Sequence, residues 1–140
     1  MSLTMRTCST LLATVAATAA LAAPAANASA AKPPLTPSVN RLDCGDEAVG
    51  LLKDCGSITF TNTSSGSVQV GPWGIDETGA VDFNVSSTTC IAVSYLAPGE
   101  SCVTNVTFKP VMTGRRSAKL IQHAGLATST TVRLVGYGTA

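Results

Sequence analysis

The sequence predicts an all-β protein, namely an immunoglobulin-like antiparallel β-sandwich of about seven strands that follows a cleaved signal peptide. Short segments in which apolar and polar residues alternate recur between turns rich in Gly, Pro, Asn and Ser. No segment after the leader has a convincing helical period, and four cysteines lie downstream of the leader. About seven short strands at regular spacing usually pack as two antiparallel sheets.

The first thirty residues have the layout of a secretory signal peptide. Arg6 precedes an apolar run at residues 11–23, and small residues offer cleavage after Ala28 or after Ala30. The run is too short and too rich in alanine to span a hydrocarbon core of about 30 Å. We therefore assign residues 1–30 to the signal, 31–37 to a proline-rich lead-in and 38–140 to the sandwich domain. This division predicts an exported chain without membrane insertion after cleavage.

The charge balance favours no class of polyanionic partner. The 140 residues carry nine basic and eight acidic side chains, and loss of Arg6 brings the formal charge from +1 to about zero. No run of basic residues suggests nucleic acid as a partner. Cleavage leaves about 110 residues, which suffices for one domain.

The cysteines predict two disulfides. Cys8 leaves with the signal, and the remaining residues are Cys44, Cys55, Cys90 and Cys102. Four cysteines in an exported chain allow three connectivities. We favour Cys44–Cys55 and Cys90–Cys102, because each pair is close in sequence and flanks a segment that must turn back. Each closed loop of this size contributes about 3 kcal/mol.

A zinc site is the alternative use of these cysteines. Their spacing includes no Cys-x-x-Cys pair, and His123 is the only histidine in the chain. We therefore expect neither a metal nor a cofactor.

The strands are expected in order along the chain. Residues 31–37 hold three prolines and form an extended tether or an arm that docks on another copy. The expected strands are 38–42, 56–62, 67–70, 82–85, 101–108, 117–123 and 129–137. Gly71 and Pro72 are expected to break the run before Trp73. The expected inward residues are Ile58, Phe60, Phe83, Val85, Cys102, Thr104, Val106, Phe108, Ala118, Leu120, Val132 and Leu134.

The mature domain resembles the choice-of-anchor D domains of bacterial surface proteins, which are immunoglobulin-like domains of the hydin and abnormal-spindle (ASH) type. The resemblance rests on residues 58–63, 82–85, 89–90, 96–102, 106–110, 114–120 and 134–138. The most specific part is Leu-Ala-Pro-Gly-Glu-Ser-Cys at 96–102, followed by Phe-Lys-Pro at 108–110.

The resemblance implies a seven-stranded sandwich with a Cys90–Cys102 disulfide beside a strand turn. It implies no catalytic residues, and it implies a bacterial protein that is secreted, periplasmic or at the cell surface. This chain departs from the pattern in its extra pair Cys44 and Cys55, and in Gln122, where an apolar residue would continue the inward face.

Five side chains are candidates for interaction with a partner. Trp73 packs in the core or grips a sugar or a protein, and the core is favoured. Tyr95 and Tyr137 are expected to point outward. Arg115 and Arg116 are expected to form a small exposed basic turn after Gly114.

No constellation of residues indicates catalysis. His123 is expected at the surface near a strand end, and no Gly-x-Ser-x-Gly elbow accompanies it. Calcium binding is the alternative to a solvated acidic loop for Asp43, Asp46, Glu47 and Asp54. A glycosidase pair is the alternative use of Asp76, Glu77 and Asp82.

We therefore expect an exported, non-enzymatic binding or structural module that acts through exposed sheet edges and loops. Its expected partner is a protein or another copy of the chain, and binding to carbohydrate has no support beyond Trp73. The alternative is a secreted protease inhibitor that inserts the loop at residues 91–101, or, with less support, a small hydrolase.

Overall fold

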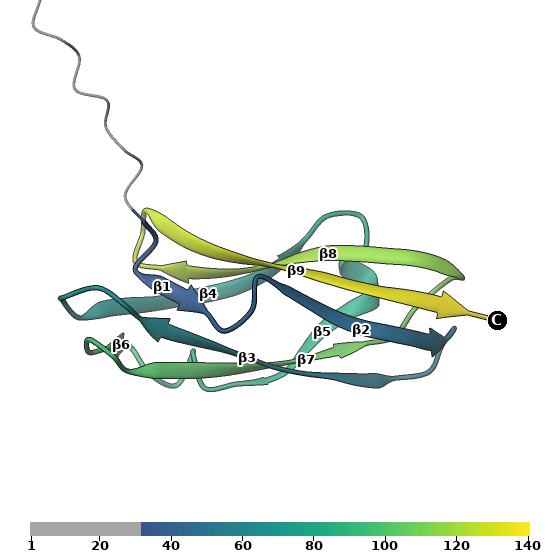
Figure 1. The fold of residues 1–140 in the computed structure, drawn as a ribbon, viewed down its shortest axis with the longest axis horizontal. Helices are drawn as coiled ribbons and strands as arrows, with labels where there is room; N and C mark the ends of the chain where they lie inside the picture. Colours follow the sequence, from purple (N-terminus) through teal and green to yellow (C-terminus); the bar gives the residue numbers. More distant parts are fainter. Residues whose placement is uncertain (1–31) are drawn as a thin grey trace, which may run out of the picture. The chain divides into compact units, whose positions relative to one another are not determined.

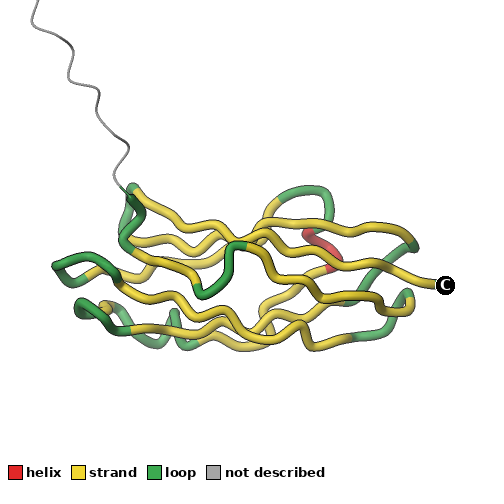
Figure 2. Tube along the Cα trace, in the orientation of Figure 1, coloured by secondary structure: helices red, strands yellow, loops and turns green. Residues whose placement is uncertain are grey.

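The computed structural model describes residues 32–140, so the predicted signal peptide and its cleavage sites lie outside the described residues. Two sheets face each other across a common core (Figures 1 and 2). The elements are β1 (Leu35–Pro37), β2 (Arg41–Ala48), β3 (Lys53–Asn62), β4 (Val68–Asp76), η1 (Ala80–Asp82), β5 (Phe83–Thr88), β6 (Tyr95–Leu96), β7 (Ser101–Phe108), β8 (Gly114–Ala124) and β9 (Thr128–Thr139).

The strand order is β1-β3-β7-β5 in one sheet and β2-β9-β8-β4-β6 in the other. This arrangement confirms the predicted immunoglobulin-like sandwich, although two of the nine strands in residues 32–140 have only two or three residues. One pair departs from the antiparallel prediction, because β2 runs parallel to β9. The chain crosses between the sheets at residues 38–40 and reaches β9 running in the same direction as that strand.

The N-terminal boundary of the sandwich differs from the sequence-based assignment. Leu35–Pro37 was assigned to the lead-in, but it pairs with β3 as an edge strand, and the Leu35 side chain is buried. Pro37 is tolerated there because an edge strand does not need a donor on its open side. The expected strand at 38–42 begins only at Arg41, because residues 38–40 make the crossing.

The expected break at Gly71 and Pro72 is wrong, since β4 continues through both residues with a register shift between Val70 and Trp73. Such a bulge removes regular partners from the backbone. Gln122, which is 1% exposed, donates from Nε2 to the Gly71 carbonyl at 2.8 Å. A buried polar side chain therefore stands where an apolar one was expected, because it supplies a donor to the bulge.

The core confirms most of the inward positions expected from the alternation. Val85 is only partly buried, and the other residues are 0–4% exposed: Ile58, Phe60, Phe83, Cys102, Thr104, Val106, Phe108, Ala118, Leu120, Val132 and Leu134. The rings of Phe83 and Phe108 stack with centroids 4.9 Å apart. Gly136 lies opposite this pair, and a Cβ there would meet the Phe108 ring at 2.7 Å. The two sheets therefore approach closely at this point only because residue 136 has no side chain.

Both favoured disulfides are present in the structure. Cys44 in β2 bonds Cys55 in β3, so this bridge joins the two sheets. Cys90 bonds Cys102 at the base of the connection that precedes β7, and both residues are at most 1% exposed.

We expect removal of either bridge to lower stability. Each of the double variants Cys44→Ala/Cys55→Ala and Cys90→Ala/Cys102→Ala is expected to lose about 3 kcal/mol of unfolding free energy, because its unfolded chain gains the freedom of an open loop. Urea unfolding followed by tryptophan fluorescence measures the change. An unchanged midpoint in both variants would contradict this account of the stability.

Candidate binding surfaces

The five candidate interaction residues are spread over the domain. Trp73 is partly buried and packs against the core. Tyr95 is exposed and pairs with Gln69 in β4. Tyr137 is half-exposed and lies directly beside Arg115 on the neighbouring strand. The structure therefore brings together Arg115 and Tyr137, and it places Trp73 and Tyr95 elsewhere.

Arg115 and Arg116 do not form the expected exposed turn. Both belong to β8, where successive side chains point to opposite faces, and Arg116 points inward. Its Nε donates to Asp82 Oδ2 at 2.7 Å, and the Asp82 side chain is fully buried. Asp82 Oδ1 also accepts from the Val111 backbone N–H at 2.8 Å. The pair therefore connects η1, β8 and the segment after β7.

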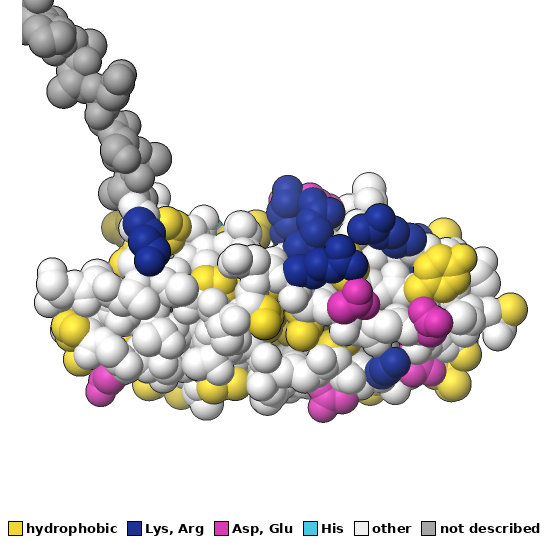
Figure 3. Space-filling view, viewed as in Figure 1, with side chains coloured by type: hydrophobic (Ala, Val, Ile, Leu, Met, Phe, Trp, Pro, Cys, Tyr) yellow, Lys and Arg dark blue, Asp and Glu magenta, His cyan; other side chains and the backbone are white. Residues whose placement is uncertain are grey.

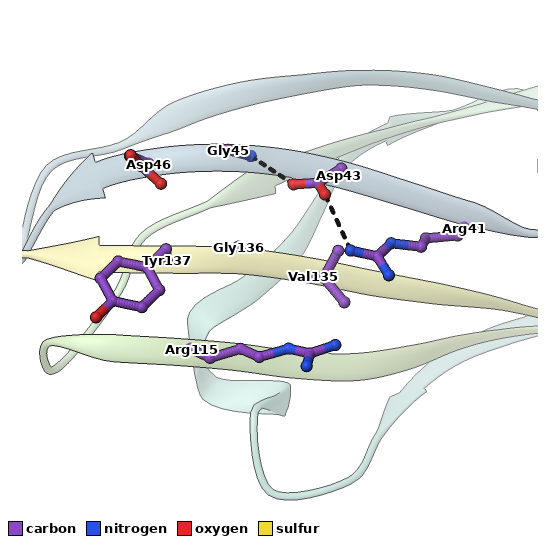
Figure 4. A pocket seen from close by; sticks show the side chains of 8 residues that line it. All are labelled: Arg41, Asp43, Gly45, Asp46, Arg115, Val135, Gly136 and Tyr137. Atoms are coloured by element: carbon purple, nitrogen blue, oxygen red, sulfur yellow. Dashed lines mark hydrogen bonds and ion pairs between the residues drawn. The ribbon is translucent and has the colours of Figure 1, made fainter.

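Arg115 points away from the core into a shallow hollow of about 220 Å³. Figure 4 shows the side chains of Arg41 and Arg115 approaching from opposite directions over Val135. Val135 faces outward, yet it is only 2% exposed. Long arginine stems commonly cover apolar surface in this way while the charged heads stay in water.

Asp43 and Asp46 are the carboxylates that line this hollow, and Asp43 is the one bonded to Arg41. Asp43 accepts from the Gly45 backbone N–H at 3.0 Å and from Arg41 Nη2 at 3.1 Å. The Gly45 hydrogen bond, followed by the hydrogen bond from Arg41, lowers the pKa of Asp43 below its usual value. Its charge therefore persists to lower pH than that of an ordinary aspartate.

Four cations form what we call the cationic face: Arg41, Arg115, Lys119 and Arg133. Figure 3 shows Lys and Arg side chains gathered on one side of the molecule. In the sheet, Arg41 lies beside Arg133, and Arg133 lies beside Lys119. This row could not be predicted from the sequence, because no local sequence pattern indicates the parallel β2–β9 pairing that brings Arg41 beside Arg133.

A second surface, the apolar end, lies where β2, β7 and β9 stop. Its six large side chains are 40–71% exposed: Val49, Leu51, Leu52, Val81, Val111 and Met112. The three segments that carry them are tied together through the backbone. Gly50 N–H donates to the Pro110 carbonyl at 2.8 Å, and Lys109 N–H donates to the Asp82 carbonyl at 2.7 Å.

A cleft of about 280 Å³ opens beside this end, between Leu52, Val81 and Lys109. The lining of this cleft includes residues of β5, which is the edge strand of the β1-β3-β7-β5 sheet. The outer side of β5 has no neighbouring strand in the part of the chain that the structure describes. Apolar side chains and an open strand edge therefore lie side by side.

The other chemical alternatives gain no support from the geometry. Within residues 32–140, no three His, Cys, Asp or Glu side chains gather closely enough to hold a metal ion, and Asp43, Asp46, Glu47 and Asp54 are spread over β2 and β3. His123 is exposed near the end of β8. Asp82 is buried in an ion pair with Arg116, so it cannot act with Asp76 or Glu77 as the carboxylate pair of a glycosidase. The described residues also contain no helix with the length and hydropathy to cross a membrane.

Comparisons with known proteins identify the fold and no family. No protein-family model and no curated protein sequence matches the chain. Among solved structures it is similar to the secreted serine protease VesC from Vibrio cholerae, with a TM-score of 0.59 and 19% identity over 76% of this chain. It is also similar to the ASH/PapD-like domain 7 of human CEP192, with a TM-score of 0.51 and 17% identity over 87% of this chain. A third similar structure is the YadV chaperone, with a TM-score of 0.50 and 12% identity over 76% of this chain.

The coverage of these neighbours differs. The chain spans 23% of VesC and 53% of YadV, but 95% of the CEP192 domain. The described domain therefore has an immunoglobulin-like fold similar to that of ASH/PapD-like domains. Fold alone assigns no activity. The two disulfides are consistent with an extracytoplasmic location.

We expect Arg115 and Arg116 to differ sharply when replaced. Arg116→Ala is expected to lose about 3 kcal/mol of unfolding free energy, because it leaves the buried Asp82 carboxylate without its partner. Arg115→Ala is the matched control on the exposed side of the strand, and is expected to lose only about 1 kcal/mol, because its stem covers part of Val135. Urea unfolding measures the unfolding free energy of both variants. Equal losses would show that the buried Asp82–Arg116 ion pair does not stabilise the fold.

The lowered pKa of Asp43 is also testable. Arg41→Gln is expected to raise it toward the usual value, because the charged hydrogen bond that favours the carboxylate is lost. It should remain partly lowered, because the larger contribution comes from the Gly45 N–H. Carboxyl carbon NMR titration measures the shift, and an unchanged pKa would contradict the assigned cause.

Proposed function

We propose that this chain is an exported, non-enzymatic binding module of the choice-of-anchor D type, which docks a protein partner on its apolar end. The observation that carries the proposal is the group of six large apolar side chains on three neighbouring connections. Exposed apolar patches of this kind on a soluble domain commonly mark interaction sites.

The rigidity of the apolar end supports a role in binding. The backbone hydrogen bonds to the Pro110 and Asp82 carbonyls fix the three segments relative to one another. The buried Asp82–Arg116 pair lies directly beneath them. A surface that is already ordered loses less conformational entropy when a partner covers it.

The cleft beside β5 suggests how the partner is held. Leu52 and Val81 are the most exposed of the six side chains, at 68% and 71%, and both line the cleft. An apolar side chain of the partner fits between them, while its backbone lies along the open edge of β5. Addition of a strand to such an edge provides main-chain hydrogen bonds, and the adjoining pocket provides selectivity.

A secreted protease inhibitor remains a second candidate, because the loop at residues 91–101 is closed at its base by the Cys90–Cys102 bridge. Ile91 and Tyr95 are exposed on this loop. A panel of secreted proteases tests the idea, and lack of inhibition across the panel removes it.

The apolar end is tested by a double substitution. Leu52→Asp/Val81→Asp is expected to weaken capture of the partner from the native extracellular fraction at least about tenfold, because two contact side chains become charged. Leu126→Asp is the control, since Leu126 is fully exposed on the β8–β9 connection.

Circular dichroism and thermal unfolding establish that both variants fold. Size-exclusion chromatography at high concentration then distinguishes a second copy from a foreign partner. A double variant that captures the same proteins as the unmodified chain would refute the proposed docking site.

A further inference from the structure

We propose that the cationic face binds an acidic polysaccharide in which carboxylates are widely spaced along the chain. This inference concerns a different surface from the apolar end and does not depend on the protein partner proposed above. Three features of this face support the proposal: the clustering of the cations, the carboxylates around them, and the other side chains on the same face.

Three of the four cations lie side by side in the sheet. Arg41, Arg133 and Lys119 lie on three adjacent strands in direct register, so about 4.8 Å separates the backbones of neighbours. Like charges directly opposite each other in a sheet are destabilising. The row therefore weakens the fold slightly, and a role in binding an anion accounts for its presence.

Two of the four cations form no close ion pair within the described residues. Arg41 pairs with Asp43, and Lys119 pairs with Glu77 at 2.6 Å. Among residues 32–140, no carboxylate lies within 4.0 Å of the Arg115 or Arg133 guanidinium. Arg115 extends over Val135 toward Arg41 (Figure 4), so its charge is directed into the hollow. Guanidinium groups bind carboxylates through paired, planar hydrogen bonds.

The acidic residues around the row limit the charge density of the ligand. Asp46 lies beside Tyr137, and Asp76 lies beside Lys119 in the sheet. Together with Asp43 and Glu77 they border the cations on two sides. A densely charged polymer such as duplex DNA would meet these carboxylates as well as the arginines. Specific binding to DNA also usually involves about 6–10 phosphate contacts, more than this face offers.

The remaining side chains on the face suit a sugar. Tyr137 presents a half-exposed ring at one end of the hollow. Ser117 lies beside Val135 on the outward side of β8, and the exposed Thr131 precedes Arg133 by two residues on the outward side of β9. An aromatic ring, hydroxyl groups and an isolated positive charge together match pyranose rings, their hydroxyls and a single uronate. An acidic peptide such as poly-glutamate carries more closely spaced carboxylates, which would meet the bordering acidic residues as well as the arginines.

The test measures retention of the full chain on immobilised hyaluronan, which carries one carboxylate on every second sugar. We expect retention that weakens as salt is raised, because exposed charges are then screened. Hyaluronan with reduced carboxyl groups, neutral dextran, duplex DNA and poly-glutamate are the comparison probes, and little retention is expected on any of them.

The variants assign the retention to this face. Arg115→Gln and Arg133→Gln are each expected to weaken binding about tenfold. Asp43→Asn is expected to strengthen it, because it removes a competing carboxylate and releases Arg41. Lys109→Gln, beside the apolar end, is the matched control and is expected to have no effect.

Three results would overturn the inference: no retention on hyaluronan, equal retention on DNA or poly-glutamate, or retention that survives both arginine substitutions. The Leu52→Asp/Val81→Asp variant is expected to bind hyaluronan normally. A negative result on hyaluronan would therefore leave the protein-docking proposal standing, and the reverse also holds.

Discussion

The close approach of the two sheets at Gly136 is the constraint on which the rest of the structure depends. The Phe108 ring fills the space that a side chain at residue 136 would need, and it stacks on Phe83. Close packing in the interior leaves little room for adjustment at such a contact. Because Phe83 begins β5 and Gly136 lies within β9, this one contact sets how the edge of one sheet sits over the middle of the other.

The same contact connects the core to both proposed surfaces. Gly136 is followed by Tyr137 and preceded by Val135, and both of these line the hollow of the cationic face. Phe83 is preceded by Asp82, which accepts from Arg116 and from the Val111 N–H beneath the apolar end. The alternation of strand residues thus places a core residue and a surface residue one position apart. Packing inside the sandwich therefore orients the side chains outside it.

Local alternation was sufficient to predict β7, most of β8 from Ser117 onward, and β9, because most of their inward residues are apolar or small and recur at every second position. It failed where the backbone departs from a regular strand. The bulge at Gly71 and Pro72 was expected to end β4, since the sequence does not reveal that Gln122, 51 residues later, donates to the Gly71 carbonyl. β1 was missed because three residues at a sheet edge, one of them Pro37, carry too short a pattern.

The disulfides were predictable because short loops favour local pairing, whereas most of the surfaces were not. Arg115 and Tyr137 were each identified as candidates, but their proximity follows from the β8–β9 register. The apolar end gathers residues from three connections, which are separated in sequence by up to 63 positions from Val49 to Met112. A single apolar residue in a turn carries no signal, because scattered exposed apolar residues are normal.

The two surfaces also differ in the physical interaction that they offer. The apolar end gains free energy by removing apolar area from water, which depends little on salt. The cationic face acts through exposed charges, whose effect declines as the ionic strength rises. Arg116 is held by the buried Asp82 and does not contribute to the cationic face. The Asp82–Arg116 pair therefore helps to order the apolar end and also removes one cation from the other surface. A change in salt should therefore alter an interaction at the cationic face and leave one at the apolar end largely unaltered.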